Sequence, residues 1–394
     1  MSWTGALREV RTMRFEEVYG RVQRGRLSCA EAADILGMSE RNFLRYRTRY
    51  EADGAEGLYD RRVGRASGRR LPVDVATQVI KLYATKYFDF NVKHFHEKLV
   101  AEHGFKFSYT WTKRVLQDAG QVKRAKKRGA HRRKRPRKAL PGVMLHQDGS
   151  RHHWVPQAEW DLIVTMDDAT SEIYSAFFVA EEGTMSSFQA LQEAIGTHGL
   201  FGSLYADRGS HYWITKEAGE GIDRRNPTQV KRALDQLGIE LIPASAPEAR
   251  GRSERMFGTL QGRLPQELRT AGITTMAAAN RYLRDVFLPA HNARFRVPAA
   301  EPGTAFIAYV GRDLADILCV QEDRVVGRDN CVSYQRLSLQ IPSDRHRHHY
   351  VKAKVRVHQY PDGRLAVFHG PRCLARYHPD GRPIGETENA KTAA

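Results

Sequence analysis

The stretch WDLIVTMDDATSEIYSAFFVA, residues 160–180, decides the fold class of this chain. It holds two short runs rich in apolar and β-branched residues, and the DDATSE between them is made of residue types typical of turns. A similar run, VMLHQD, precedes it at residues 143–148. Three strands in this order predict an antiparallel meander.

The segments after the meander alternate between helical and strand patterns. The sequence predicts a helix at SSFQALQEAIGTHG (186–199), a strand at SLYAD (203–207), a helix at QVKRALDQLG (229–238) and a strand at IELIPA (239–244). From about Arg252 the pattern is helical again. Three strands followed by alternating helices and strands predict an α/β layer fold, which we place at residues 141–312.

Upstream of this core, residues 1–64 have the pattern of a helix-turn-helix. In SCAE, Ser28 can cap a helix and Glu31 can answer it three residues later, while Gly37 allows a turn and Ser39 can cap the next helix. That second helix has an aromatic face, and its opposite face carries the residues expected to bind DNA: Arg41, Arg45, Thr48 and Arg49. Taken alone, the motif is also compatible with a helical hairpin that has a solvated basic face.

A second copy of the pattern lies at residues 65–121. Asn91 to His103 predicts a helix ended by Gly104, and Ser108 is placed to cap the helix in YTWTKRVLQDAG. The apolar face of that helix is expected to hold Trp111, Val115 and Ala119, and its DNA-binding face Thr110, Lys113, Arg114 and Gln117. Two such units in series would cover a longer DNA site than one.

Residues 122–140 form a basic linker. KRAKKRGAHRRKRPRK (123–138) holds eleven lysines and arginines in sixteen positions, and its Gly129 and Pro136 disfavour regular structure. Such a charge run is usually solvated, but this one joins two predicted DNA-binding units to the core and can neutralise phosphates without reading sequence. The linker residues expected to contact DNA are Lys126, Lys127, Arg132, Arg133 and Lys134.

The C-terminal residues 317–386 have strand patterns throughout. CVSYQRLSLQIP, YVKAKVRVHQY and RLAVFHG alternate apolar and polar residues along most of each run, and Asp362-Gly363 between the last two is a strong hairpin signal. These patterns predict a small all-β barrel or sandwich with basic outward positions such as Lys352, Lys354 and Arg356. An interaction module without DNA contact and a DNA-binding module are both open for this region.

Composition narrows the class of protein. The 394 residues allow two to four domains, and 41% hydrophobic and 27% charged residues are ordinary for globular protein. An excess of 63 lysines and arginines over 45 aspartates and glutamates gives a net charge of +18 and predicts a polyanionic partner. The four cysteines suggest neither a zinc site nor a disulfide framework. Without a signal-peptide pattern or an apolar run of ~20 residues, a cytoplasmic protein is expected.

Three acidic residues stand where a predicted strand ends or a helix begins. Asp148 ends VMLHQD, Asp207 ends SLYAD, and Glu254 lies early in the last predicted helix of the core. Clustered carboxylates repel one another unless cations neutralise them, and Mg²⁺ prefers such oxygen ligands. Two divalent ions about 4 Å apart can activate an attacking oxygen and stabilise a leaving one during phosphodiester cleavage. For Glu254 alone, the ordinary alternative is a surface glutamate paired with Arg250 or Arg255.

HQDGS (146–150), ADRGS (206–210) and SAPEARGRSERMFGTLQ (245–261) resemble the three signatures of DDE transposases and retroviral integrases, whose catalytic core is ribonuclease H-like. With its helix-turn-helix units, basic linker and β domain, the chain is most similar to bacterial insertion-sequence transposases of the ISNCY type. The resemblance implies that Asp148, Asp207 and Glu254 form a catalytic triad that holds two Mg²⁺ or Mn²⁺ ions. It disfavours three nearby alternatives: Asp167, Asp168 and Glu248.

The resemblance also implies an activity. A transposase of this kind would bind the terminal inverted repeats of its element, cleave a strand to free a 3′-hydroxyl, and join that end to target DNA as a homo-oligomer, at the nucleoid of a bacterial cytoplasm and without a membrane partner. Arg250 and Arg252 would steady DNA beside the site. The spacing from Asp207 to Glu254 exceeds the family's usual one, and the extra length falls in ITKEAGEGIDRRNP (214–227). The alternatives are a DNA-binding regulator with an inactive core and a metal-dependent nuclease without joining activity.

Overall fold

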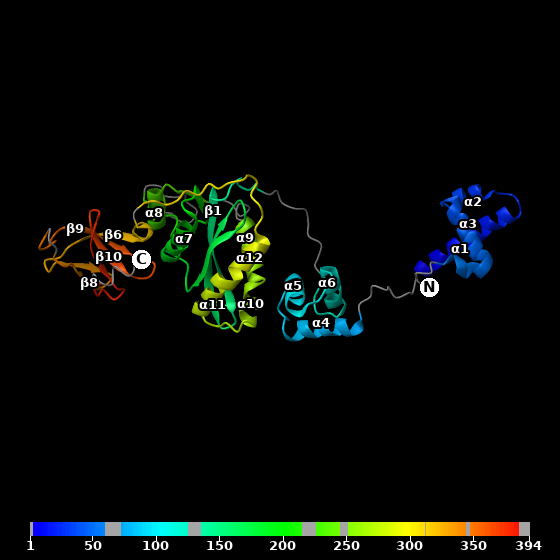
Figure 1. Cartoon of the computed structure of the whole chain (residues 1–394), viewed down its shortest axis with the longest axis horizontal. Helices are drawn as coiled ribbons and strands as arrows, with labels where there is room; N and C mark the ends of the chain where they lie inside the picture. The colour runs from blue at the N-terminus through cyan, green and yellow to red at the C-terminus, as the bar shows by residue number, and fades with distance from the viewer. Residues whose placement is uncertain are drawn as a thin grey trace. The chain divides into compact units, whose positions relative to one another are not determined.

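The computed structural model describes residues 3–59, 72–124, 135–214, 226–244, 251–311, 313–343 and 347–385. The chain divides into two compact units, Met1–Thr77 and Gln78–Ala394, whose helices and strands are labelled in Figure 1. Several predicted positions lie outside the described residues: Lys126, Lys127, Arg132, Arg133, Lys134, Arg250, Glu248 and most of residues 214–227. Within the described ranges, no helix is long and apolar enough to cross a membrane.

The first unit is helical. It contains α1 (Trp3–Gln23), α2 (Cys29–Ile35), α3 (Glu40–Asp53) and a 3-10 turn, η1 (Gly54–Leu58). The predicted capping box is present, because Ser28 Oγ accepts a hydrogen bond from Glu31 N and the Glu31 carboxylate accepts one from Ser28 N at 2.7 Å. Phe15 of α1 and Phe43 of α3 pack together with the alanines of α2 as the core of this unit.

A second group of helices begins with α4 (Val73–Thr85), which spans the boundary between the units, and continues in the second unit with α5 (Val92–His103) and α6 (Tyr109–Asp118). We call α5 and α6 the second helix pair. Ser108 caps α6 as predicted. Gly104 ends α5 with a φ of 69°, a left-handed conformation that glycine adopts without strain.

The apolar face predicted for α6 is wrong by one position. Thr112 and Leu116 are the buried residues of α6, whereas Ala119 is exposed and Trp111 is only half-buried. A polar residue can take the buried position because the Thr112 hydroxyl lies 2.9 Å from Nδ1 of His96 on α5.

A five-stranded mixed sheet forms the centre of the second unit. Its order is β3-β2-β1-β4-β5, with β1 (Met144–Val155), β2 (Ala158–Asp167), β3 (Ile173–Val179), β4 (Ser203–Ala206) and β5 (Glu240–Pro243). The first three strands pair antiparallel, as the meander prediction requires, and β4 and β5 run parallel to β1. The predicted mixed α/β core is therefore confirmed.

Helices cover both faces of this sheet (Figure 1). One face carries α7 (Thr184–His198) and α8 (Gln229–Leu237). The other carries α9 (Gly251–Gln261), α10 (Leu264–Thr270), α11 (Met276–Tyr282), a π turn, η3 (Leu283–Phe287), and α12 (Leu288–Phe295). This packing places α9, the helix that holds Glu254, directly over the sheet.

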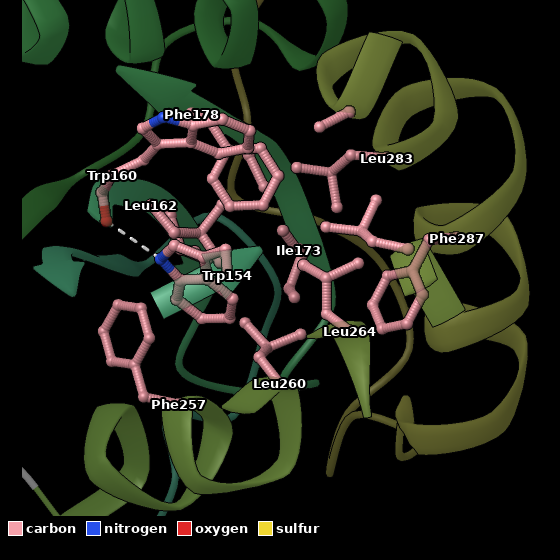
Figure 2. Packing of buried hydrophobic residues seen from close by; sticks show 14 of the residues in the cluster. Trp154, Trp160, Leu162, Ile173, Phe178, Phe257, Leu260, Leu264, Leu283 and Phe287 are labelled. Atoms are coloured by element: carbon pink, nitrogen blue, oxygen red, sulfur yellow. Dashed lines mark hydrogen bonds between the residues drawn. The ribbon is translucent and has the colours of Figure 1, made fainter. Parts of the chain in front are cut away.

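The core beneath α9 and α10 is built from aromatic and leucine side chains (Figure 2). Phe257, Leu260 and Leu264 are buried there, at the spacing that puts side chains on one face of a helical segment. Trp154 of β1 is fully buried, and its indole Nε1 donates to the carbonyl oxygen of Trp160 at 3.0 Å. That bond satisfies the polar end of a large buried ring.

The C-terminal part is all β. A four-stranded sheet has the order β11-β10-β9-β6, from β6 (Val320–Val325), β9 (Lys354–Gln359), β10 (Leu365–His369) and β11 (Arg372–Tyr377), and a two-stranded sheet pairs β7 (Cys331–Tyr334) with β8 (Leu337–Gln340). The first predicted strand run is thus a hairpin, turned at Gln335 and Arg336 with φ of 46° and 67°. Turns of that kind usually contain glycine or asparagine, so the sequence carried no signal for it. The described strands form two separate sheets, and closure into a barrel stays a prediction.

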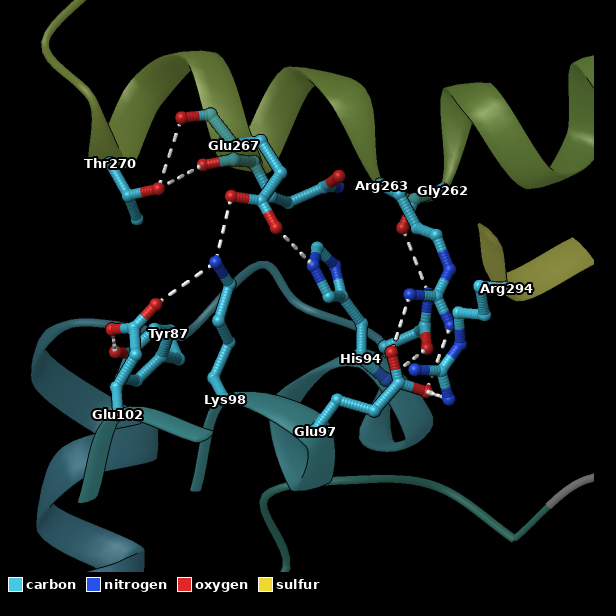
Figure 3. A network of polar contacts seen from close by, with 12 residues as sticks. Tyr87, His94, Glu97, Lys98, Glu102, Gly262, Arg263, Glu267, Thr270 and Arg294 are labelled. Atoms are coloured by element: carbon cyan, nitrogen blue, oxygen red, sulfur yellow. Dashed lines mark hydrogen bonds and ion pairs between the residues drawn. The ribbon is translucent and has the colours of Figure 1, made fainter. Parts of the chain in front are cut away.

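The second helix pair contacts the core through charged and polar side chains (Figure 3). His94 Nε2 of α5 lies 2.6 Å from one carboxylate oxygen of Glu267 on α10, and Lys98 Nζ lies 2.8 Å from the other. Two further contacts flank this pair: Glu97 accepts hydrogen bonds from Arg263, and Asp89 accepts them from Arg269. The interface is therefore held largely by ion pairs and hydrogen bonds.

Candidate active site

Asp148 lies in β1, and Asp207 directly follows β4, the strand that pairs parallel with β1. The register of β1 and β4 runs from Met144 and Ser203 to His146 and Tyr205, so each aspartate lies two residues beyond the last pair of that register. Neighbouring strands lie about 4.8 Å apart, and alternate residues along a strand share a face. The rings of His146 and Tyr205 meet edge-on on this face, with centroids 5.1 Å apart. Asp148 therefore lies on this face, and Asp207 lies at the end of the neighbouring strand.

Helix α9 runs along β1 on this face. Near its start, Arg252 forms an ion pair with Asp168, and the same carboxylate is 2.7 Å from His146 Nε2 of β1. At its end, Gln261 Nε2 donates to Ser150 Oγ of β1 at 3.0 Å. These contacts fix the helix against residues 146 to 150 of the strand.

Glu254 lies in the first turn of α9 and is exposed. It is seven residues before Gln261, which is close to two helical turns, so both side chains leave the same face of the helix. Gln261 touches Ser150, and Asp148 lies midway between His146 and Ser150 on the strand. Glu254 thus lies on the side of α9 that faces the part of β1 carrying Asp148.

Within the described ranges, no three histidine, cysteine, aspartate or glutamate side chains are grouped closely enough to hold a metal ion. The loop that leads into α9, residues 245–250, is outside those ranges. The donor chemistry does fit a hard divalent cation, because Asp148, Asp207 and Glu254 offer carboxylate oxygens, the ligands that Mg²⁺ and Mn²⁺ prefer.

Tyr212 contacts Gln147, the residue before Asp148, and was not predicted to belong to the site. Its hydroxyl donates to Gln147 Oε1 at 2.7 Å and accepts from Ser187 Oγ at 3.3 Å, which links β1 to α7. Burial raises the pKa of Tyr212 well above its ordinary value, and the charges of nearby carboxylates, Asp207 and Asp148 among them, raise it further. The hydroxyl therefore stays neutral and keeps its hydrogen bonds to Gln147 and Ser187. The only sequence signal was a tyrosine five residues after Asp207.

Glu182, in the loop after β3, is a second residue that sequence reasoning missed. Its carboxylate lies so close to Gly149, the residue after Asp148, that a Cβ atom at that position would displace the Glu182 side chain. His211 Nε2 lies 3.5 Å from the same carboxylate. A fourth acidic side chain thus borders the candidate site.

The alternative acids Asp167 and Asp168 are both fully buried. Asp167 accepts hydrogen bonds from the backbone N of Gly142 and from N and Oγ1 of Thr170. Asp168 contacts four partners on other segments: Arg135, Lys138, His146 and Arg252. Their carboxylates are committed to internal contacts.

The predicted DNA-binding residues differ in exposure. The exposed ones are Arg41, Arg45, Thr48, Thr110, Lys113 and Arg114, and the half-buried ones are Arg49 and Gln117. Arg252 has a different environment from the one expected, because its side chain is 17% exposed and turned toward Asp168. Its ion pair with a buried carboxylate explains why it does not lie open to solvent.

Comparison with known proteins decides the family. A family model described as winged helix-turn helix matches residues 21–73. The putative transposase y4bF of Sinorhizobium fredii (strain NBRC 101917 / NGR234) is 32% identical over 355 residues, which span 89% of this chain and 77% of that protein. This chain belongs to the transposase family. As a transposase it is a DNA-cleaving and DNA-joining enzyme, and its N-terminal helices include a DNA-binding helix-turn-helix.

Other similarities of this transposase are more distant. The transposase for insertion sequence IS1202 of Streptococcus pneumoniae is 27% identical over 296 residues, 66% of this chain and 64% of that protein. The HTLV-2 integrase catalytic core domain in complex with magnesium is 16% identical, with 37% of this chain and 89% of that one covered and a TM-score of 0.28. A simian T-cell lymphotropic virus intasome in complex with PP2A regulatory subunit B56 gamma is 14% identical. The match covers 78% of this chain and 99% of that one, with a TM-score of 0.33. Likeness at these TM-scores adds nothing to the family assignment.

Proposed function

We propose that this transposase binds the terminal inverted repeats of an insertion sequence and that Asp148, Asp207 and Glu254 form the site where the DNA strands are cut and joined. The observation that carries the proposal is the arrangement around β1. Asp148 lies on β1, Asp207 directly follows β4, which pairs with β1, and the helix that carries Glu254 lies along β1.

The triad would hold two Mg²⁺ or Mn²⁺ ions. Bound there, the metal would supply Lewis-acid activation of the attacking oxygen and stabilisation of the leaving one. The chain itself supplies the geometry. Strands β1 and β4 position the two aspartates, the Tyr212 hydroxyl donates a hydrogen bond to Gln147 of β1, and α9 brings Glu254 to the sheet.

DNA recognition is assigned to the two helical regions. The exposed basic side chains of α3 and α6 would enter the major groove, and the basic linker would follow the phosphate backbone. We place the domain boundaries at residues 1–64, 65–121, 122–140, 141–312 and 317–386, the last being a small barrel. Because two element ends must be paired, the active form would be a homo-oligomer on DNA at the bacterial nucleoid, in the cytoplasm.

Replacement of Glu254 by glutamine tests the proposal. The amide keeps the size of the side chain but not its charge, so binding of end DNA should be unchanged and strand cleavage should fall by about 10³-fold or more. Glu240→Gln is the matched control, because Glu240 is also exposed but lies on the edge strand β5. The proposal fails if the Glu254 variant cleaves end DNA as well as the control does.

A further inference from the structure

Asp168 is a buried meeting point of several segments. It follows β2 directly and is fully buried. Its carboxylate accepts hydrogen bonds from the guanidinium groups of Arg135 and Arg252, from the backbone N of Lys138 at 2.8 Å, and pairs with Nε2 of His146 at 2.7 Å. Burial by itself would raise the pKa of Asp168, but the hydrogen bonds from His146 and Lys138 and the charge of Arg252 hold that pKa well below its ordinary value. Asp168 is therefore a fixed negative charge.

Two of its partners lie two residues before a proposed catalytic carboxylate. His146 precedes Asp148 on β1, with both side chains on the same face of the strand. Arg252 precedes Glu254 in the first turn of α9. The Asp168 carboxylate thus connects β1, which carries Asp148, to α9, which carries Glu254.

Asp207, the remaining residue of the proposed triad, is connected to the same cluster through Tyr205, which lies two residues before it. The Tyr205 ring lies 5.1 Å from the His146 ring, and the Arg135 guanidinium lies 5.7 Å above it. Arg252 Nη2 also donates to the carbonyl oxygen of Arg135 at 2.7 Å. The three segments that carry the proposed triad, together with the end of the basic linker, therefore converge around Asp168.

We propose that Asp168 is a positioning residue that sets the spacing of Asp148, Asp207 and Glu254 for metal binding. The proposal rests on the function proposed above. Without the Asp168 charge, Arg252, whose side chain is 17% exposed, and Arg135, whose side chain is 36% exposed, would face each other with no carboxylate between them, and the start of α9 would move. Loss of a residue that orients metal ligands typically costs about 10- to 100-fold in metal affinity.

The test compares Asp168→Asn with Asp167→Asn. Both changes remove one charge from a fully buried carboxylate, but the partners of Asp167 are Gly142 and Thr170, in the turns at the ends of β1 and β2. Mn²⁺ binding to the full chain is followed by electron paramagnetic resonance without DNA. We expect the Mn²⁺ dissociation constant of the Asp168 variant to rise about 10- to 100-fold. The Asp167 variant should lose thermal stability and keep its Mn²⁺ affinity.

A second readout separates positioning from a general loss of structure. Saturating Mn²⁺ should restore end cleavage by the Asp168 variant, because its three ligands remain. Should Asp168→Asn fail to fold, Arg252→Gln, which removes one partner and leaves the carboxylate, should show the same direction of change. Equal Mn²⁺ affinities for the Asp168 and Asp167 variants would overturn the positioning role.

Asp148→Asn distinguishes failure of this inference from failure of the proposed function. It should abolish Mn²⁺ binding and resist rescue by saturating Mn²⁺. If it binds Mn²⁺ like the unmodified protein, the triad itself is wrong. If it loses binding while Asp168→Asn behaves as Asp167→Asn does, only the role of Asp168 is refuted.

Discussion

Replacing Glu267 by glutamine is expected to loosen the second helix pair from the core. The Glu267 side chain is 13% exposed and sits between His94 Nε2, at 2.6 Å, and Lys98 Nζ, at 2.8 Å (Figure 3). Glutamine has nearly the same shape, so it preserves packing on α10. It carries no charge, so Lys98 keeps only its ion pair with Glu102, at 3.0 Å.

The magnitude follows from the titration of Glu267. Burial alone would raise the pKa of this carboxyl, but hydrogen bonds from His94 and Lys98 lower it to about 2. At 1.36 kcal/mol for each pKa unit, the difference from the ordinary value of 4.5 is worth about 3 kcal/mol. Since the folded pKa is the lower one, this stabilisation is complete above about pH 4.5 and is lost as the pH falls toward 2.

Hydrogen–deuterium exchange of the full chain at neutral pH measures the effect. Amides of α5 and α10 should exchange faster in the Glu267 variant, by an amount that corresponds to about 3 kcal/mol. The control is Glu172→Gln, which breaks the exposed pair between Glu172 and Arg296 and should cost at most about 1 kcal/mol. If exchange in α5 and α10 is the same in both variants, the polar network does not hold these helices together.

Three further predictions concern the other parts of the chain. Leu260→Ala opens a cavity under α9, where Leu260 is fully buried, and should lower the free energy of unfolding by about 2–5 kcal/mol in urea titration; a loss below about 1 kcal/mol would mean that α9 is not packed as described. Ser28→Ala removes the capping box of α2 and should cost about 1 kcal/mol in thermal unfolding, with exposed Ser210→Ala, outside any helix, as the neutral reference. Arg114→Ala on α6 should weaken binding of end DNA and reduce the slope of log affinity against log salt by about 1; an unchanged slope would exclude a phosphate contact.

The features that follow from local patterns could be predicted from the sequence. Apolar runs separated by turn residues predicted the antiparallel meander, and the alternating helices and strands after it predicted the α/β core. The spacing of Ser28 and Glu31 predicted a capping box, and Ser108 was predicted to cap the helix that it caps in the structure. Each of these depends on residues a few positions apart.

The features that the sequence did not predict depend on distant or unusual contacts. Asp168 meets Arg252 across 84 positions, and His94 meets Glu267 across 173. No local pattern marks either pair, because charged residues occur throughout this chain. The buried Thr112 on α6 is explained only by its partner His96, and the Gln335-Arg336 turn uses residue types that rarely adopt positive φ.

The central claim is that Asp148, Asp207 and Glu254 together carry out the chemistry on DNA. The most direct measurement is joining of a pre-cleaved element end to a target plasmid in the presence of Mg²⁺, by the unmodified protein and by Asp148→Asn, Asp207→Asn and Glu254→Gln. We predict joined product from the unmodified protein and none from the three variants, although each still binds the end DNA. Joining at the unmodified rate by any of the three variants would contradict the claim.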